Sequence, residues 1–181
     1  MRRTFALVSL LSVLPACIVE APTSDKSAPA TQGAAARAQV KAVPVKNGAV
    51  LGDLAELVGA TFAPPSLTVG DSTRVVLVFR AIRPSTEDWQ VFVHVEDAEG
   101  RGERLNADHA FRTPTTTWSA GQVVQDEFGL ILPQGWRSRA VNVFVGLWQP
   151  TTNARIKVRN PEAVRTDGND RVLLVQLPVV G

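Results

Sequence analysis

Short runs of alternating apolar and polar residues fill the chain from Gly48 to its C-terminus. Alternation with a period of two is typical of a β-strand that buries one face and exposes the other. Turn-forming Gly, Pro, Asn and Asp residues separate these runs. The clearest runs cover residues 74–80, 89–96, 123–132, 140–148 and 171–179.

Shorter or more ambiguous segments complete the pattern. Residues 97–100 predict a hairpin turn before a short return strand at 104–106, and a further strand is predicted at 154–158. Residues 54–62 fit either a strand or a single helical turn. The run at 171–179 is apolar on both faces, which is typical of a central strand.

Together these segments amount to seven or eight short strands, with no long helical pattern among them. This spacing predicts an all-β, antiparallel β-sandwich over residues 48–181. A single cysteine cannot form a disulfide within the chain. A domain of about this size buries roughly two-thirds of its unfolded surface, so a hydrophobic core alone can stabilise it.

The segment before this domain has a different composition. Residues 18–47 are rich in Ala, Pro, Ser, Thr and Gln and contain no aromatic residue. Such a stretch cannot bury enough apolar surface to offset its ordering entropy. We therefore interpret residues 17–47 as a disordered tether with a mean reach on the order of 30 Å. A short helix through residues 34–38 is the alternative.

The N-terminus has the form of a secretory signal. Arg2-Arg3 precede an apolar run at 4–13, which is too short to span a bilayer, since a spanning helix needs about 20 apolar residues. The run ends on Leu14-Pro15-Ala16-Cys17, which resembles the lipobox of bacterial lipoproteins. The resemblance implies cleavage after a signal at 1–16, diacylglycerol on the Cys17 thiol and usually an acylated new amino terminus. An ordinary secretory signal with a chance cysteine is the alternative.

The same resemblance bears on location and charge. Ile18 stands where an aspartate retains lipoproteins in the inner membrane of well-studied enterobacteria, so the analogy implies the outer membrane. The chain has 19 Lys and Arg against 17 Asp and Glu, and loss of Arg2 and Arg3 with the signal leaves 17 of each. A mature net charge of zero gives no reason to expect a nucleic-acid partner.

The folded part resembles a bacterial sandwich module found at the C-terminal ends of some membrane glycosyltransferases and in free-standing envelope lipoproteins. The resemblance implies an immunoglobulin-like β-sandwich and a link to cell-envelope carbohydrate. It rests on residues 91–95, Asp108-His109, residues 114–118, Gly121, Asp126, residues 145–148, Arg155-Ile156 and, upstream, residues 67–71.

No catalytic motif is recognisable in the sequence. It contains no nucleophile elbow and no Gly-rich phosphate loop, so we expect no enzyme and no cofactor. His94, Glu96, Asp108 and His109 could in principle meet around a metal, but zinc sites usually show a tighter local signature. We favour no metal, and expect Asp108 and His109 to fix a loop through hydrogen bonds, with the carboxylate accepting from backbone N–H groups.

Asp126 is the polar residue whose position is least expected. By the parity of its run it shares the buried face with Val124 and Phe128. A buried carboxylate must be paired or hydrogen-bonded. Arg155 is the first candidate partner and Arg112 the second; a β-bulge that reverses the parity is the competing explanation.

The four tryptophans suggest carbohydrate, because sugar rings stack on exposed aromatic faces. Trp136 lies in a predicted loop and Trp148 lies opposite the apolar face of its strand, so these two are the candidate ligand-binding residues. Trp89 and Trp118 lie at strand or turn edges. Tryptophan in a sandwich is, however, more often part of the core.

These observations predict a lipid-anchored binding module that recognises envelope or extracellular carbohydrate. The alternative is a non-catalytic structural or protein-interaction subunit of an outer-membrane or periplasmic assembly. An exposed sheet edge or apolar patch would then supply the contact.

Overall fold

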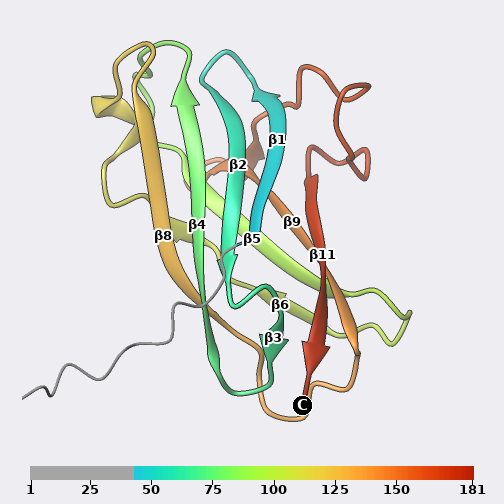
Figure 1. Cartoon of the computed structure of the whole chain (residues 1–181). Helices are drawn as coiled ribbons and strands as arrows, with labels where there is room; N and C mark the ends of the chain where they lie inside the picture. The colour runs from blue at the N-terminus through green and yellow to red at the C-terminus, as the bar shows by residue number, and fades with distance from the viewer. Residues whose placement is uncertain (1–42) are drawn as a thin grey trace, which may run out of the picture. The chain divides into compact units, whose positions relative to one another are not determined.

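A computed structural model describes residues 43–181, which form two β-sheets (Figure 1). The predicted signal peptide, Cys17 and most of the predicted tether lie outside the described residues. The small sheet is antiparallel, with strand order β1-β2-β4-β8. Its strands are β1 (Val43–Leu51), β2 (Ala55–Ala63), β4 (Ser72–Ala81) and β8 (Val123–Ile131).

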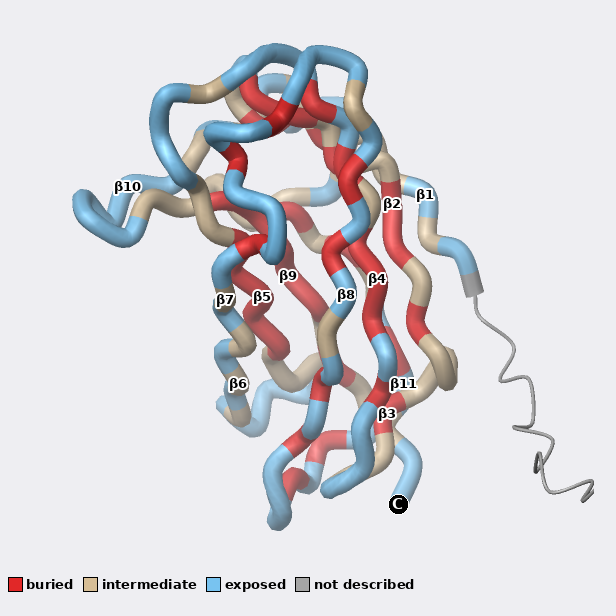
Figure 2. Tube along the Cα trace, turned by 90° about the vertical axis from the view of Figure 1, so that its left-hand side faces the viewer, coloured by how far each residue is buried: buried red, intermediate tan, exposed pale blue. Residues whose placement is uncertain are grey.

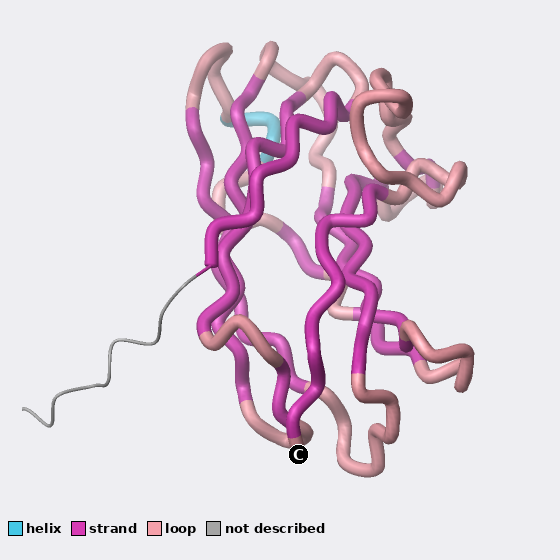
Figure 3. Tube along the Cα trace, turned by 45° about the vertical axis from the view of Figure 1, so that its right-hand side comes forward, coloured by secondary structure: helices cyan, strands magenta, loops and turns pink. Residues whose placement is uncertain are grey.

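The large sheet has strand order β3-β11-β9-β5-β6, with β10 beside β9 and β7 beside β5. All of its pairings are antiparallel except β3 with β11, which is parallel. Its strands are β3 (Leu67–Thr68), β5 (Gln90–Asp97), β6 (Arg104–Asn106), β7 (His109–Ala110), β9 (Ala140–Gln149), β10 (Ala154–Arg155) and β11 (Val172–Val180). One 3₁₀ turn, η1 (Thr115–Thr117), lies at an end of the sandwich (Figure 3).

The core lies between the two sheets, as the alternation predicts. Val91, Val93 and Val95 of β5 are at most 1% exposed, and they face Leu57 and Leu77 of the small sheet within one hydrophobic cluster. Buried and exposed residues alternate along β4 and β8 (Figure 2). The predicted all-β sandwich is confirmed, and seven of the described strands are 8 to 10 residues long.

An aromatic cluster closes the core next to η1. Phe111 packs edge-on against Phe79 with ring centroids 5.3 Å apart, and Trp118 packs against Phe111 at 4.9 Å. Trp118 is 2% exposed, and its indole N–H donates to the carbonyl oxygen of Thr113. The cluster fixes the segment between β7 and η1, which forms one wall of the groove described below.

Two predictions about the strands are wrong, and one alternative left open by the sequence is decided. The first strand begins at Val43, inside the predicted tether, and pairs Val43 with Phe62. Pro44 masks this strand in the sequence, but a proline is tolerated there because β1 is an edge strand. Residues 54–62 form strand β2 and not a helical turn. Strand β11 is not a central strand. It pairs with β9 along one side, but on its other side it pairs only with the two-residue β3, and Val180 is 47% exposed.

The outer face of the large sheet is also covered. Phe92, His94 and Phe144 point away from the core, yet each is at most 8% exposed. The segment before β11 approaches this face closely, because a Cβ on Gly146 would lie 3.0 Å from the carbonyl oxygen of Asp170. The large sheet is therefore buried on both faces around Phe92.

Candidate functional site

Strand β8 is an edge of the small sheet, and a groove runs along its free side. The opposite wall is the segment from His109 to Thr113, which includes β7 of the large sheet. Figure 2 looks onto this side of the molecule, with β7 and β8 facing the viewer. The groove has a volume of about 920 Å³ and is open to solvent along its length.

His109 and Asp126 join the two walls at the base of the groove. The Nε2 atom of His109 lies 2.9 Å from Oδ2 of Asp126, and its Nδ1 atom lies 2.8 Å from the carbonyl oxygen of Ala107. A carbonyl and an ionised carboxylate can only accept, so both ring nitrogens must donate. The geometry therefore fits an imidazolium cation paired with the Asp126 carboxylate.

The electrostatics agree with this protonation state. Burial disfavours the charged ring, but the hydrogen bonds to Asp126 and Ala107 outweigh it and raise the pKa of His109 above its ordinary value. Asp126 is 6% exposed, on the buried face that parity predicts. Its partner, however, is His109 and neither Arg155 nor Arg112.

The outer part of the groove carries paired polar side chains. Arg74 donates from Nε and Nη2 to the two carboxylate oxygens of Glu127, each at 2.6 Å. This bidentate pair holds two exposed side chains in one plane. Gln125 points outward from the same strand, and Arg112 on the opposite wall forms no salt bridge with any described residue. The groove thus presents donors and acceptors in fixed directions.

One aromatic ring borders these polar groups. Phe128 is half-buried and packs against His109, with ring centroids 4.5 Å apart. It lines the groove beside Asp126. An aromatic surface next to fixed hydrogen-bonding groups can hold an amphipathic ligand that has both apolar and hydroxyl-bearing faces.

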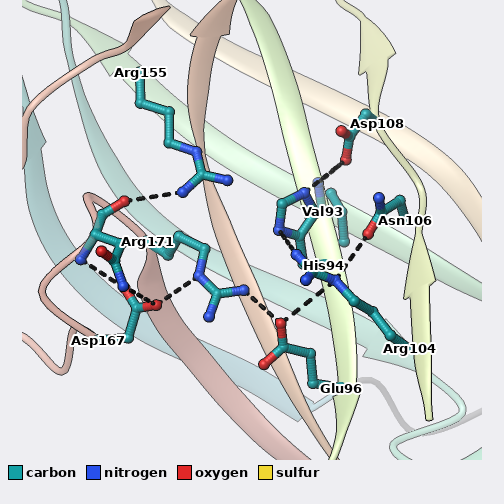
Figure 4. A network of polar contacts seen from close by, with 10 residues as sticks. Val93, His94, Glu96, Arg104, Asn106, Asp108, Arg155, Asp167 and Arg171 are labelled. Atoms are coloured by element: carbon teal, nitrogen blue, oxygen red, sulfur yellow. Dashed lines mark hydrogen bonds and ion pairs between the residues drawn. The ribbon is translucent and has the colours of Figure 1, made fainter. Parts of the chain in front are cut away.

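Asp108 and His94 belong to a separate cluster on the other side of β5 (Figure 4). As expected, the Asp108 carboxylate accepts from a backbone N–H, that of Val93, at 3.0 Å. His94 Nε2 lies 3.5 Å from Oδ1 of Asp108, and its Nδ1 lies 3.2 Å from Nη2 of Arg104. Because arginine can only donate, Nδ1 must accept, so His94 is neutral. Burial lowers the pKa of His94, Asp108 opposes the decrease and Arg104 adds to it.

The predicted pairing of Arg155 with Asp126 is wrong, because the two residues lie in different layers. β10 pairs with β9 and places Arg155 on the outer face of the large sheet (Figure 4). There its guanidinium lies 5.0 Å from the centroid of the Phe92 ring and donates to the carbonyl oxygen of Asn169. Asp126 lies on the inner face of the small sheet.

The two predicted tryptophans differ in exposure. Trp136 is 9% exposed, so the expectation that it projects from its loop is wrong. Trp148 is half-buried. Within the described residues, the indole N–H groups of both are buried without a hydrogen-bond partner. Trp136 therefore offers little ring area to a ligand, whereas Trp148 stays partly exposed.

The described residues contain no cluster of three or more His, Cys, Asp or Glu side chains that could hold a metal ion. The two histidines considered as metal ligands have different partners: His109 pairs with Asp126, whereas His94 contacts Asp108 and Arg104. In residues 43–181 no helix has the length and apolar character needed to cross a membrane.

Sequence reasoning missed Arg74, Glu127, Gln125 and Phe128 as groove residues. The alternation along β8 places Gln125 and Glu127 on an exposed face, and that was the available signal. The sequence does not show that β8 is an edge strand or that it lies opposite β7. Only the sheet order turns an exposed strand face into the wall of a groove.

The fold and site thus define a mostly antiparallel β-sandwich with a polar groove along one edge. Comparison with known protein families and with curated proteins finds no match. Among solved structures, the crystal structure of the C-terminal domain of wzt is similar at 18% sequence identity. The alignment covers 78% of this chain and 79% of that one, with a TM-score of 0.42. At that TM-score the likeness supports no argument about function.

Proposed function

We propose that this protein is a carbohydrate-binding module of the bacterial cell envelope, that it binds without catalysis, and that lipid on Cys17 holds it at the outer membrane. The observation that carries the binding proposal is the groove along β8. It combines the fixed Arg74–Glu127 pair, Gln125 and Arg112 with the Phe128 ring.

The chemistry of this set matches a saccharide. Neighbouring sugar hydroxyls both donate and accept, so planar guanidinium, carboxylate and amide groups can each bind two of them. The C–H face of a sugar ring is apolar and packs against an aromatic ring. The open shape of the groove also allows a chain of sugars to enter and leave at its ends.

The proposed anchor rests on the sequence alone. The Leu14-Pro15-Ala16-Cys17 box resembles a lipidation signal, and two or more acyl chains give stable attachment to a membrane. A Cys17→Ala chain should no longer incorporate labelled palmitate and should leave the membrane fraction. Label retained by that variant would contradict the anchor, and wild-type protein in the inner-membrane fraction would contradict the outer-membrane placement.

Binding can be tested with the full chain in detergent on an array of bacterial and plant glycans. Saturable binding should weaken roughly five- to thirtyfold on Gln125→Ala or Arg112→Ala, since loss of a hydrogen bond to a bound ligand removes about 1 to 2 kcal/mol. Arg165→Ala is the matched control, because it removes an exposed arginine that does not line the groove. Equal loss in the control, or no glycan bound at all, would overturn the proposal.

A second candidate function follows from the free edge of β8. No described strand pairs with its outer side, so a strand from an envelope protein could extend the small sheet there. A photo-reactive residue at Gln125 should then cross-link a protein partner in whole cells. Such capture, without glycan binding, would favour the interaction subunit over the carbohydrate module.

A further inference from the structure

Trp89 differs from the other three tryptophans in what its indole N–H can do. The N–H of Trp118 is used within the fold, and those of Trp136 and Trp148 are buried. Trp89 is half-buried, and its N–H neither is buried nor bonds to any described residue. It is therefore the tryptophan whose N–H is free to donate to a ligand.

The Trp89 ring lines a second hollow, separate from the β8 groove. This hollow has a volume of about 400 Å³ and lies between the β1–β2 turn and the loop from β4 to β5. Ile156 contributes an apolar side. The inner edge of Trp89 packs against the hydrophobic core, so the ring is supported from behind.

The loop that carries Trp89 is fixed in place. Its backbone N–H donates to Oγ1 of Thr115 at 2.8 Å, and Thr115 is fully buried. Thr115 also donates from its backbone N–H to Asp88 and from its hydroxyl to the carbonyl oxygen of Glu87. Ser85 closes the rim by donating to the same Glu87 carbonyl oxygen. A ligand would meet a preformed surface and incur little ordering cost.

Charged groups of both signs stand at the rim of this hollow. Asp53 accepts from Nη2 of Arg83 at 2.5 Å, and Arg159 lies 3.8 Å from the other carboxylate oxygen. A carboxylate and a guanidinium beside an aromatic ring offer both acceptors and donors to sugar hydroxyls. Glu87 also lines the hollow, so two carboxylates and two guanidiniums balance there, and the site favours an uncharged sugar over an acidic one.

We infer that this hollow is a second binding site that takes a single neutral sugar ring, stacked on Trp89 with its hydroxyls on the Asp53–Arg83 pair. The inference extends the proposed function, because it assumes the same ligand class, but it uses none of the β8 groove residues. The segment from Arg112 to Thr115 connects the two places, since Arg112 lines the groove and Thr115 fixes Trp89.

The test reads the indole N–H signals of the ¹⁵N-labelled full chain by NMR. Methyl glycosides of glucose, galactose, mannose and N-acetylglucosamine are the probes, with a proline-rich peptide as comparison. At least one glycoside should shift the Trp89 signal saturably and leave that of Trp118 in place. Trp89→Ala should weaken this binding at least about tenfold, and Trp89→Phe by less, since phenylalanine keeps a stacking ring.

Two further variants separate the outcomes. Asp53→Asn should weaken glycoside binding several-fold, whereas Arg112→Ala should leave it unchanged while reducing binding of longer glycans in the groove. A wild-type Trp89 signal that no glycoside moves would overturn the inference, even if glycan binding that depends on Arg112 remains. A shift caused by the peptide alone would also overturn it and would identify a protein ligand instead.

Discussion

The two histidines of the chain lie on adjacent strands of the large sheet but are held in opposite protonation states. His109 has an acceptor at each ring nitrogen, Ala107 and Asp126, and is an imidazolium. His94 has an arginine donor at Nδ1 and is neutral. Burial lowers the pKa of both rings, so the difference comes from the neighbours: hydrogen bonds to acceptors reverse the effect at His109.

The two histidines also differ in where they lie relative to the groove. His109 joins the two walls of the groove along β8, and its charge is needed to neutralise a buried carboxylate. His94 lies beneath Arg104, Arg155 and Arg171 on the outer face of the large sheet, where a further positive charge would be repelled (Figure 4). A histidine in this domain therefore cannot be assigned a role from its exposure alone.

The strongest test replaces each histidine with phenylalanine. His109→Phe leaves the Asp126 carboxylate buried without a donor, and we expect a loss of about 3 kcal/mol in the free energy of unfolding. His94→Phe keeps a neutral ring packed against Phe92, at 4.9 Å in the wild type, and should cost less than about 1.5 kcal/mol. Urea denaturation followed by circular dichroism measures both. Equal costs would contradict the contrast between the two sites.

Removing the carboxylate should have the next largest effect. Asp126→Asn keeps the shape but deprives the imidazolium of its charged acceptor, and we expect a loss of about 2 kcal/mol in the free energy of unfolding. Glu127→Gln, at the next position, removes an exposed carboxylate and should leave the unfolding midpoint nearly unchanged. The pKa of His109 should fall in Asp126→Asn only. An unchanged unfolding midpoint in that variant would mean that the pair contributes nothing to stability.

Much of this arrangement follows from sequence patterns, because alternation directly reports which face of a strand is buried. The burial of Val93 and Asp126 could both be predicted in this way. The partner of Asp126 could not, since His109 is 17 positions away on the other sheet and reaches it only where β7 lies opposite β8. By charge Arg155 is a suitable partner, but it lies on the outer face of the large sheet and cannot reach Asp126.

The tryptophans show a second limit of sequence reasoning. Loop position and strand parity predict exposure for Trp136 and Trp148, but other segments cover Trp136 and bury the indole N–H groups of both. Trp89, just before β5, is half-buried and lines a hollow together with residues of the loop before it. Coverage of a side chain by distant segments has no signature in local alternation.

The pH dependence of stability should show both histidines, with opposite signs. The pKa of His109 is raised by folding, so its contribution is complete below the unfolded value of about 6.5 and is lost as pH rises through the folded value. The pKa of His94 is lowered, so its contribution is present above about 6.5 and is lost as pH falls toward the folded value.

Unfolding free energies measured from about pH 5 to about pH 8 would resolve the two contributions. His109→Gln should remove the loss of stability at the alkaline end and leave the acid end unchanged. His94→Gln should do the reverse, since glutamine does not titrate. If both variants flatten the same end of the profile, the assignment of opposite protonation states is wrong.

The smallest expected effect is a change in the pKa of His94 when its charged neighbours are altered one at a time. Arg104 lowers that pKa and Asp108 raises it, so Arg104→Gln should increase it and Asp108→Asn should decrease it. The imidazole signals followed by NMR against pH give the direction, and His109 in the same spectra is the internal reference for Arg104→Gln. Asp108→Asn also weakens the hydrogen bond to the Val93 N–H, so a small loss of stability should accompany its effect.

Movement of the His94 pKa in the same direction in both variants would mean that changed burial, and not charge, sets this pKa. That outcome would leave His109 as the single residue of the pair whose protonation is governed by its hydrogen-bond partners.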